Sequence, residues 1–146
     1  MKTSDKPIVL DYSYPSSVEK VWLALTRPEE MRKWFFENIE AFEPAKGFKT
    51  RFIVFSGERR FTHVWAITEV IPYRKISYQW KYEEYPGDSV VCFELAMKEN
   101  VVNLKLTLTV TEDFPETIPE FTWESCIGGW KYFLGERLKA YLVQAV

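Results

Sequence analysis

Residues 62–82 read THVWAITEVIPYRKISYQWKY, and this stretch decides the fold. Bulky side chains alternate with polar ones on both sides of Pro72-Tyr73, as in two strands that each bury one face. If Pro72-Tyr73 is a two-residue hairpin turn, Trp65 lies directly opposite Trp80. The stretch therefore predicts an antiparallel hairpin with one aromatic face.

The same alternation continues along much of the chain. Together with the two strands of this hairpin, the predicted strands are Ile8–Tyr14, Ile39–Glu43, Phe48–Phe55, Arg60–Ile71, Arg74–Glu83, Ser89–Met97 and Val101–Thr111. Further turns at Gly57-Glu58, Pro86-Gly87 and Glu99-Asn100 extend the register from strand to strand. We therefore expect a meander that begins after residue 38 and pairs each strand with the next.

These turns predict one aromatic face and one wet face for the sheet. The inner rows are Thr50, Trp65, Trp80, Phe93 and Leu106; Phe52, His63, Tyr82, Val91 and Leu108; and Phe48, Ile67, Tyr78, Leu95 and Leu104. The alternate rows are mixed and polar, with Glu94 opposite Lys105. An antiparallel sheet of this kind needs a second layer over its apolar face.

Helices account for the rest of the pattern. Two short ones should follow the first strand, because Ser16-Ser17-Val18-Glu19 and Thr26-Arg27-Pro28-Glu29 both have the spacing of a capping signal. A long helix from about Pro119 to Leu142 is expected to cover the sheet, because apolar residues recur at three- and four-residue spacing: Trp123, Ile127, Trp130, Leu134, Leu138 and Tyr141. Three glycines interrupt this helix: Gly128, Gly129 and Gly135. Either close packing on the sheet or room for a ligand would explain them.

Composition limits the function classes. The 146 residues suit one domain, 1–146, and 17% of them are aromatic, whereas a net charge of −2 argues against a nucleic-acid partner. We expect a cytoplasmic protein with no membrane span, because no signal peptide or long apolar run is present. One histidine and two cysteines, Cys92 and Cys126, 34 positions apart, predict no metal site, no cofactor and no disulfide.

Three motifs carry a family resemblance. They are Val21-Trp22-Leu23-Ala24-Leu25-Thr26 with Pro28-Glu29 and Trp34; Ile67-Thr68-Glu69-Val70-Ile71-Pro72 leading into Ile76-Ser77-Tyr78-Gln79-Trp80; and Gly129-Trp130, Leu134, Leu138-Lys139 and Leu142. With the order of elements, they make the chain resemble the α+β helix-grip fold of the START-like (SRPBCC, birch-allergen-like) superfamily. Within it the chain is most similar to the family of homologues of the activator of heat shock protein 90 ATPase. Asp113-Phe114-Pro115-Glu116 departs from the glycine-centred loop of many members.

This resemblance implies a curved antiparallel sheet of about seven strands that grips the long C-terminal helix, with a cavity between them. Superfamily members use that cavity for lipids, polyketides or aromatic compounds, and some for ring-closing chemistry. The candidate cavity residues here are Trp34, Thr50, Phe52, His63, Trp65, Tyr78, Trp80, Tyr82, Phe93, Trp123, Ile127 and Trp130. The same large rings could instead fill the space as a solid core.

Three function classes stay open. The first is a non-enzymatic domain that binds a small hydrophobic, aromatic or lipid-like molecule, as a monomer or weak homodimer. The second is a chaperone-associated module that binds a protein partner. The third is a cyclase-like or hydrolase-like enzyme that uses His63 or Glu69, although His63 suits a hydrogen-bonded wall residue better and Glu69 suits an ion pair with a lysine. We favour the first and assign no catalytic residue.

Overall fold

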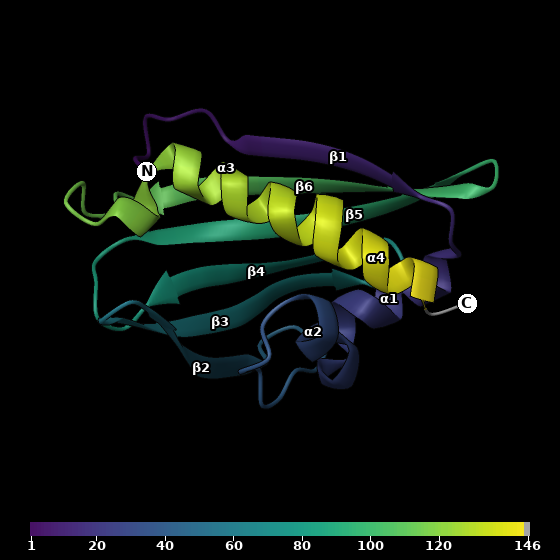
Figure 1. Cartoon of the computed structure of the whole chain (residues 1–146), viewed down its shortest axis with the longest axis horizontal. Coiled ribbons are helices and arrows are strands. Elements are labelled where there is room, and N and C mark those ends of the chain that lie inside the picture. The colour runs from purple at the N-terminus through teal and green to yellow at the C-terminus, as the bar shows by residue number, and fades with distance from the viewer. Residues whose placement is uncertain (145–146) are drawn as a thin grey trace.

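The computed structural model describes residues 1–144 and has one helix lying diagonally across one face of a sheet (Figure 1). The sheet is antiparallel with strand order β1-β6-β5-β4-β3-β2. Its strands are β1 (Ile8–Tyr14), β2 (Lys49–Ser56), β3 (Arg59–Ile71), β4 (Lys75–Tyr82), β5 (Asp88–Lys98) and β6 (Val101–Glu112). This is the helix-grip fold that the sequence predicts.

Helices fill two places in the chain. The short helices α1 (Val18–Thr26) and α2 (Pro28–Trp34) follow β1 and lie together near one end of the sheet (Figure 1). The C-terminal helix consists of α3 (Trp123–Tyr132), the π-helical turn η2 (Phe133–Arg137) and α4 (Leu138–Gln144). The short 3-10 turn η1 (Pro119–Phe121) precedes it and is separated from it by Thr122, whose backbone is extended. None of the helices described is long and apolar enough to cross a membrane.

Both predicted capping segments lie at helix starts, but neither forms the hydrogen bonds of a capping box. Ser17, not Ser16, caps α1 by accepting a hydrogen bond from the backbone N–H of Lys20 at 3.2 Å. Arg27 precedes α2 without a side-chain cap, because the Thr26 hydroxyl donates back to the carbonyl of Trp22 at 2.7 Å. Both helices nevertheless begin within two residues of the predicted start.

The predicted strand Ile39–Glu43 is also wrong, and the sheet has six strands. Ile39 and Phe42 are buried, so their spacing reflects two anchors in the core and not a pleated strand. Arg32 donates to the carbonyls of Ile39 and Glu40 at 2.6 and 3.0 Å, and it supplies bonds that a neighbouring strand would otherwise make.

The register is confirmed for most of the sheet. The predicted pairs between β2 and β3 and between β5 and β6 are present. Trp65 also pairs with Trp80, but the two-residue turn at Pro72-Tyr73 is wrong: Ile71 lies opposite Lys75, and a bulge between Ile67 and Glu69 restores the predicted register. Between β4 and β5 the prediction is wrong, since Trp80 lies opposite Ser89 and not Phe93. The chain does not turn tightly at Pro86-Gly87, because the backbone N–H of Glu83 still donates to the Thr62 carbonyl of β3 at 3.1 Å. The shift is an even number of residues, so the inner face keeps its side chains.

The C-terminal helix covers this face through Trp130, Leu134, Leu138 and Leu142. These residues are four apart, a spacing that the wider π-helical turn permits. The predicted stripe is wrong at its N-terminal end, because Trp123 is 37% exposed. At the other end Leu142, which the pattern also places beside the stripe, is buried, and Tyr141 packs partly buried against the core.

Gly135 and the other two glycines of this helix have different roles. A Cβ on Gly135 would lie 3.0 Å from the ring of Tyr12, so here close packing explains the glycine. A Cβ on Gly128 or Gly129 would have no neighbour within 4 Å, so close packing is the wrong explanation for them.

Replacing Trp80 by alanine should destabilise the fold strongly. Trp80 is 8% exposed and its removal leaves a cavity, so Trp80→Ala should cost about 3–5 kcal/mol of unfolding free energy. Trp123→Ala is the matched control on the exposed end of the helix and should change it by about 0.5 kcal/mol or less. Urea denaturation measures both, and equal losses would contradict the packing described here.

Candidate functional site

A pocket of about 260 Å³ lies between the sheet and the N-terminal half of the long helix. Its sheet wall consists of Val54, Ser56, Phe61, His63, Trp80 and Tyr82, and the opposite wall of Phe36, Glu120, Phe121, Ser125, Cys126, Gly129, Trp130 and Phe133. The pocket is slightly below the roughly 300–1,000 Å³ of many ligand sites, but larger than the roughly 150 Å³ cavity that holds benzene. The pocket is open to solvent on the side of Ser125 and Gly129, which are exposed. The wider depressions elsewhere are also surface grooves, and charged side chains lie along them.

His63 is the central polar residue of the sheet wall. Its position on β3 turns it inward, where its ring stacks on Phe52 at 4.7 Å and meets Tyr82 edge-on at 4.8 Å. Nδ1 lies 3.1 Å from the carbonyl of Phe61, which can only accept, so Nδ1 carries the hydrogen. Burial lowers the pKa of His63 to about 4, against the opposing effects of the Phe61 bond and of Glu84. His63 is therefore neutral at pH 7, with Nε2 as an acceptor.

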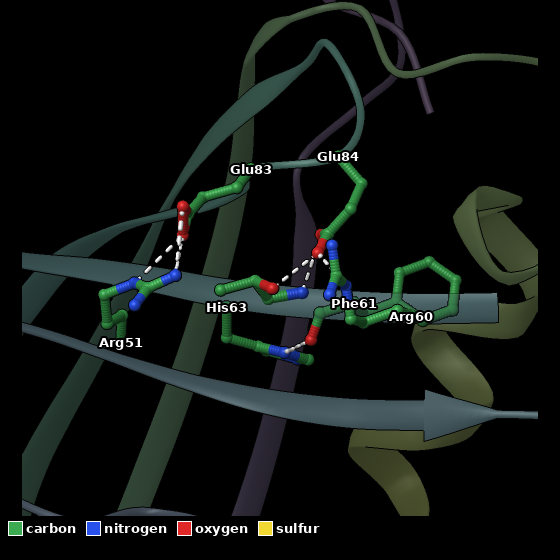
Figure 2. Close-up of polar contacts among 7 residues, drawn as sticks. Arg51, Arg60, Phe61, His63, Glu83 and Glu84 are labelled. Atoms are coloured by element: carbon green, nitrogen blue, oxygen red, sulfur yellow. Dashed lines mark hydrogen bonds and ion pairs between the residues drawn. The ribbon is translucent and has the colours of Figure 1, made fainter.

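The carboxylates nearest to His63 have other partners. Figure 2 shows Glu83 directed at Arg51 and Glu84 at Arg60, with N–O distances of 2.6 and 3.1 Å. Glu84 also accepts from the backbone N–H of Thr62 at 2.7 Å and from its hydroxyl. These bonds outweigh burial and lower the pKa of Glu84. Among the described residues no carboxylate bonds to the His63 ring, so the geometry does not assemble the acid-histidine pair of a general base.

Two further polar groups belong to the sheet wall and the rim. The Tyr82 hydroxyl accepts from the indole N–H of Trp80 at 2.9 Å, and burial raises the pKa of Tyr82. At the rim, Glu120 accepts from the Ser56 hydroxyl at 2.8 Å, which lowers the pKa of this carboxyl. The polar groups are few, and each wall is mainly aromatic.

Cys126 lies beside these groups as a free thiol. Burial raises its pKa to about 11, so the thiol stays protonated at neutral pH and is a poor nucleophile. The described residues contain no group of three or more histidine, cysteine, aspartate or glutamate side chains placed to hold a metal ion.

The structure separates the candidate cavity residues into two groups. His63, Trp80, Tyr82 and Trp130 line the pocket. Trp34, Phe52, Trp65, Tyr78 and Phe93 are buried core residues outside the pocket lining, Thr50 and Ile127 are half-buried, and Trp123 is exposed. Glu69 forms the expected ion pair, with Lys75 Nζ 2.8 Å away.

Several lining residues escape the sequence analysis. Phe36 follows α2 in an irregular segment, so it does not follow from a regular period, whereas Phe133 lies beside the apolar stripe that the helical spacing predicts. Phe61 could have been found, because it is two residues from His63 and shares its inward side.

Comparison with known proteins gives the family. The model of the activator of Hsp90 ATPase homolog 1-like proteins matches residues 15–143. The chain belongs to this family. No curated protein sequence matches the chain.

Solved structures share the fold of this family member. One is protein CV1439 from Chromobacterium violaceum, with a TM-score of 0.75, 23% identity, and coverage of 93% of this chain and 96% of that chain. Another is protein MLL2253 from Mesorhizobium loti, with a TM-score of 0.73, 24% identity, and coverage of 97% and 99%. The Aha1 dimer from Colwellia psychrerythraea has a TM-score of 0.74, 23% identity, and coverage of 94% and 96%. At these identities the likeness concerns the fold alone.

The burial of His63 should make the fold sensitive to acid. Its pKa falls from an ordinary 6.5 to about 4 in the folded chain, so the unfolded chain binds a proton first as the pH drops. Between pH 6.5 and 4 this should remove about 3 kcal/mol of unfolding free energy. His63→Phe keeps a ring but cannot titrate, so its stability should fall less over the same range. Urea denaturation at several pH values tests this, and parallel curves for the two proteins would contradict it.

Proposed function

We propose that the chain binds a small apolar molecule, aromatic or lipid-like, in the pocket between β2–β4 and α3, without catalysing a reaction on it. The observation that carries this proposal is the space itself. Gly129 lines the pocket, and a Cβ at this position would have no neighbour within 4 Å. Gly129 lies on the exposed side of this groove, and the buried rings of Trp80 and Trp130 belong to its lining, so a ligand that enters would cover apolar surface.

The walls suit a ligand with a flat apolar surface. Trp80 and Trp130 meet edge-on at 5.5 Å at the pocket, and Phe36 and Phe133 meet edge-on at 5.0 Å on the opposite wall. Burial of apolar ligand area against such rings is favourable by roughly 25 cal/mol per Å². The volume of about 260 Å³ favours one or two fused rings or a short acyl chain over a whole membrane lipid.

The absence of a paired acid or base among the described residues supports binding without catalysis. The pocket histidine bonds to a backbone carbonyl, and the pocket thiol has a raised pKa. A catalytic use of His63 or Glu69 therefore has less support, because Glu69 is paired with Lys75 outside the pocket.

Filling the pocket from Gly129 should abolish ligand binding. A stabilising ligand at 100 times its dissociation constant adds about 2.7 kcal/mol, which corresponds to a rise in melting temperature of roughly 5–10 °C. Gly129→Leu should remove this rise for hits from a library of small aromatic and acyl compounds. Gly128→Leu is the matched control, because Gly128 has the same open surroundings but does not line the pocket.

Differential scanning fluorimetry gives the readout, and isothermal titration calorimetry confirms each hit. If no compound of a broad library stabilises the wild-type chain, the proposal is wrong. Equal effects of Gly129→Leu and Gly128→Leu would place the binding site elsewhere.

Self-association is a second candidate function, and a chaperone partner of the kind in the family name would need a similar surface. The free edge strand β2 presents Ile53 and Phe55, which are 39% and 66% exposed. Exposed apolar edge strands favour pairing with another chain. A dimer is described for the Aha1 neighbour from Colwellia psychrerythraea.

Sedimentation velocity at increasing concentration tests this candidate. Phe55→Glu should shift the chain toward the monomer. Val9→Glu on the other edge strand, β1, is the control, since Val9 is 48% exposed. A monomer at all concentrations would exclude self-association through β2.

A further inference from the structure

The hydrogen-bonding groups of the pocket define a ligand chemistry more narrowly than its apolar walls do. His63 uses Nδ1 as a donor to the Phe61 carbonyl, so Nε2 is left as an acceptor. Within the described residues Nε2 has no hydrogen-bond partner. It is not one of the fully enclosed polar atoms without a partner, which are Ser16 Oγ and Trp65 Nε1. A molecule in the pocket can therefore reach it.

Tyr82 supplies the complementary group next to His63. Its oxygen already accepts from the indole N–H of Trp80, while its own O–H has no acceptor among the residues described. The two rings are 4.8 Å apart, and both line the pocket. One free acceptor and one free donor on adjacent rings of the pocket match a group that can both donate and accept, as a hydroxyl does.

The charges around the pocket argue against an ionised ligand. No lysine or arginine lines the pocket, and the acidic residue of the lining, Glu120 at the rim, already has Arg59 as its ion-pair partner at 3.5 Å. An anionic head group would lose its hydration there without gaining a cation. A carboxylate also lacks the hydrogen that an acceptor nitrogen requires.

We infer that the pocket selects an uncharged aromatic molecule with a hydroxyl group, which donates to Nε2 of His63 and accepts from the hydroxyl of Tyr82. This inference rests on the proposed function. The ligand class is thus phenols and similar neutral ring alcohols, in place of fatty acids or aromatic carboxylates. The low pKa of His63 agrees with it, since the imidazole stays neutral at pH 7.

Two probes of nearly equal size separate the hydrogen bond from apolar burial. 2-Naphthol has the hydroxyl, and 2-methylnaphthalene has a methyl group in its place. His63→Phe removes the acceptor. We expect it to weaken the binding of 2-naphthol, relative to that of 2-methylnaphthalene, about three- to tenfold. 2-Naphthoate should bind the wild-type chain on the order of 100-fold more weakly than 2-naphthol at pH 7.

Calorimetric titration of the full chain gives these constants, and Tyr82→Phe is the second variant if His63→Phe does not fold. Tyr82→Phe keeps the ring and removes only the donor, so it should also lower the preference for 2-naphthol. His63→Gln retains an acceptor oxygen and should keep part of the preference.

The outcomes test separately whether the pocket binds an apolar molecule and whether it selects a hydroxyl group. If both neutral probes bind and the ratio is the same in the wild type and the variants, the hydroxyl inference is wrong and the apolar pocket stands. If neither probe binds and no library compound does, the proposed function fails together with the inference. Preferred binding of 2-naphthoate would also overturn the inference.

Discussion

The contact between the long helix and the aromatic face of the sheet is the constraint on which the rest of the structure depends. Trp130 approaches Trp80 at 5.5 Å and Phe93 at 5.7 Å, both in edge-on geometry, and so joins two strands to one helix. Leu134, Leu138 and Leu142 continue the contact toward the C-terminus. The rest of the aromatic face is covered by the segment that follows α1, where Phe35 and Phe42 pack on Trp65, so both covers are needed to keep these rings from water.

Close contacts hold the middle of the helix against β1, and the pocket lies on the N-terminal side of them. At the π-helical turn the Tyr14 hydroxyl donates to the carbonyl of Leu134 at 2.7 Å, and Gly135 lets the ring of Tyr12 approach. One turn or more toward the N-terminus, Gly129 has no close neighbour beyond its own helix. The space between helix and sheet is therefore closed around η2 and open around α3.

Sequence patterns predict the parts of this arrangement that depend on the two-residue alternation of strands and the 3.6-residue period of helices. Alternation gives the inner face correctly even where the pairing of β4 with β5 is wrong, because a slip by an even number of residues moves no side chain across the sheet. The family resemblance and the apolar stripe of the C-terminal helix correctly predict that this helix packs on the sheet. The strand predicted at Ile39–Glu43 fails because the two buried side chains of this irregular segment, Ile39 and Phe42, are three residues apart and would lie on opposite faces of a strand. The π-helical turn leaves no local signal, since it arises where the helix meets β1.

The candidate site is less predictable than the fold for the same reason. His63, Trp80, Tyr82 and Trp130 lie on regular elements and follow from the register, whereas Phe36 reaches the pocket from irregular backbone. Sequence alone also cannot decide between a filled core and a cavity, because that depends on how individual rings stack. In the structure both occur: Trp65 and Phe93 fill the centre, and the space remains at one end.

The filled centre of the core limits the size of any ligand in the pocket. The rings that fill the centre are fixed by their neighbours, as Trp34 is by the 2.8 Å bond from its indole to the carbonyl of Ala24. Enlarging the pocket into the core would break such bonds and separate stacked rings, at a cost of several kcal/mol. Enlarging it toward the rim would move the bond between Ser56 and Glu120, which is exposed and therefore cheaper to break. A ligand longer than two fused rings would thus extend past Glu120 into solvent, with its ring still seated between His63 and Gly129.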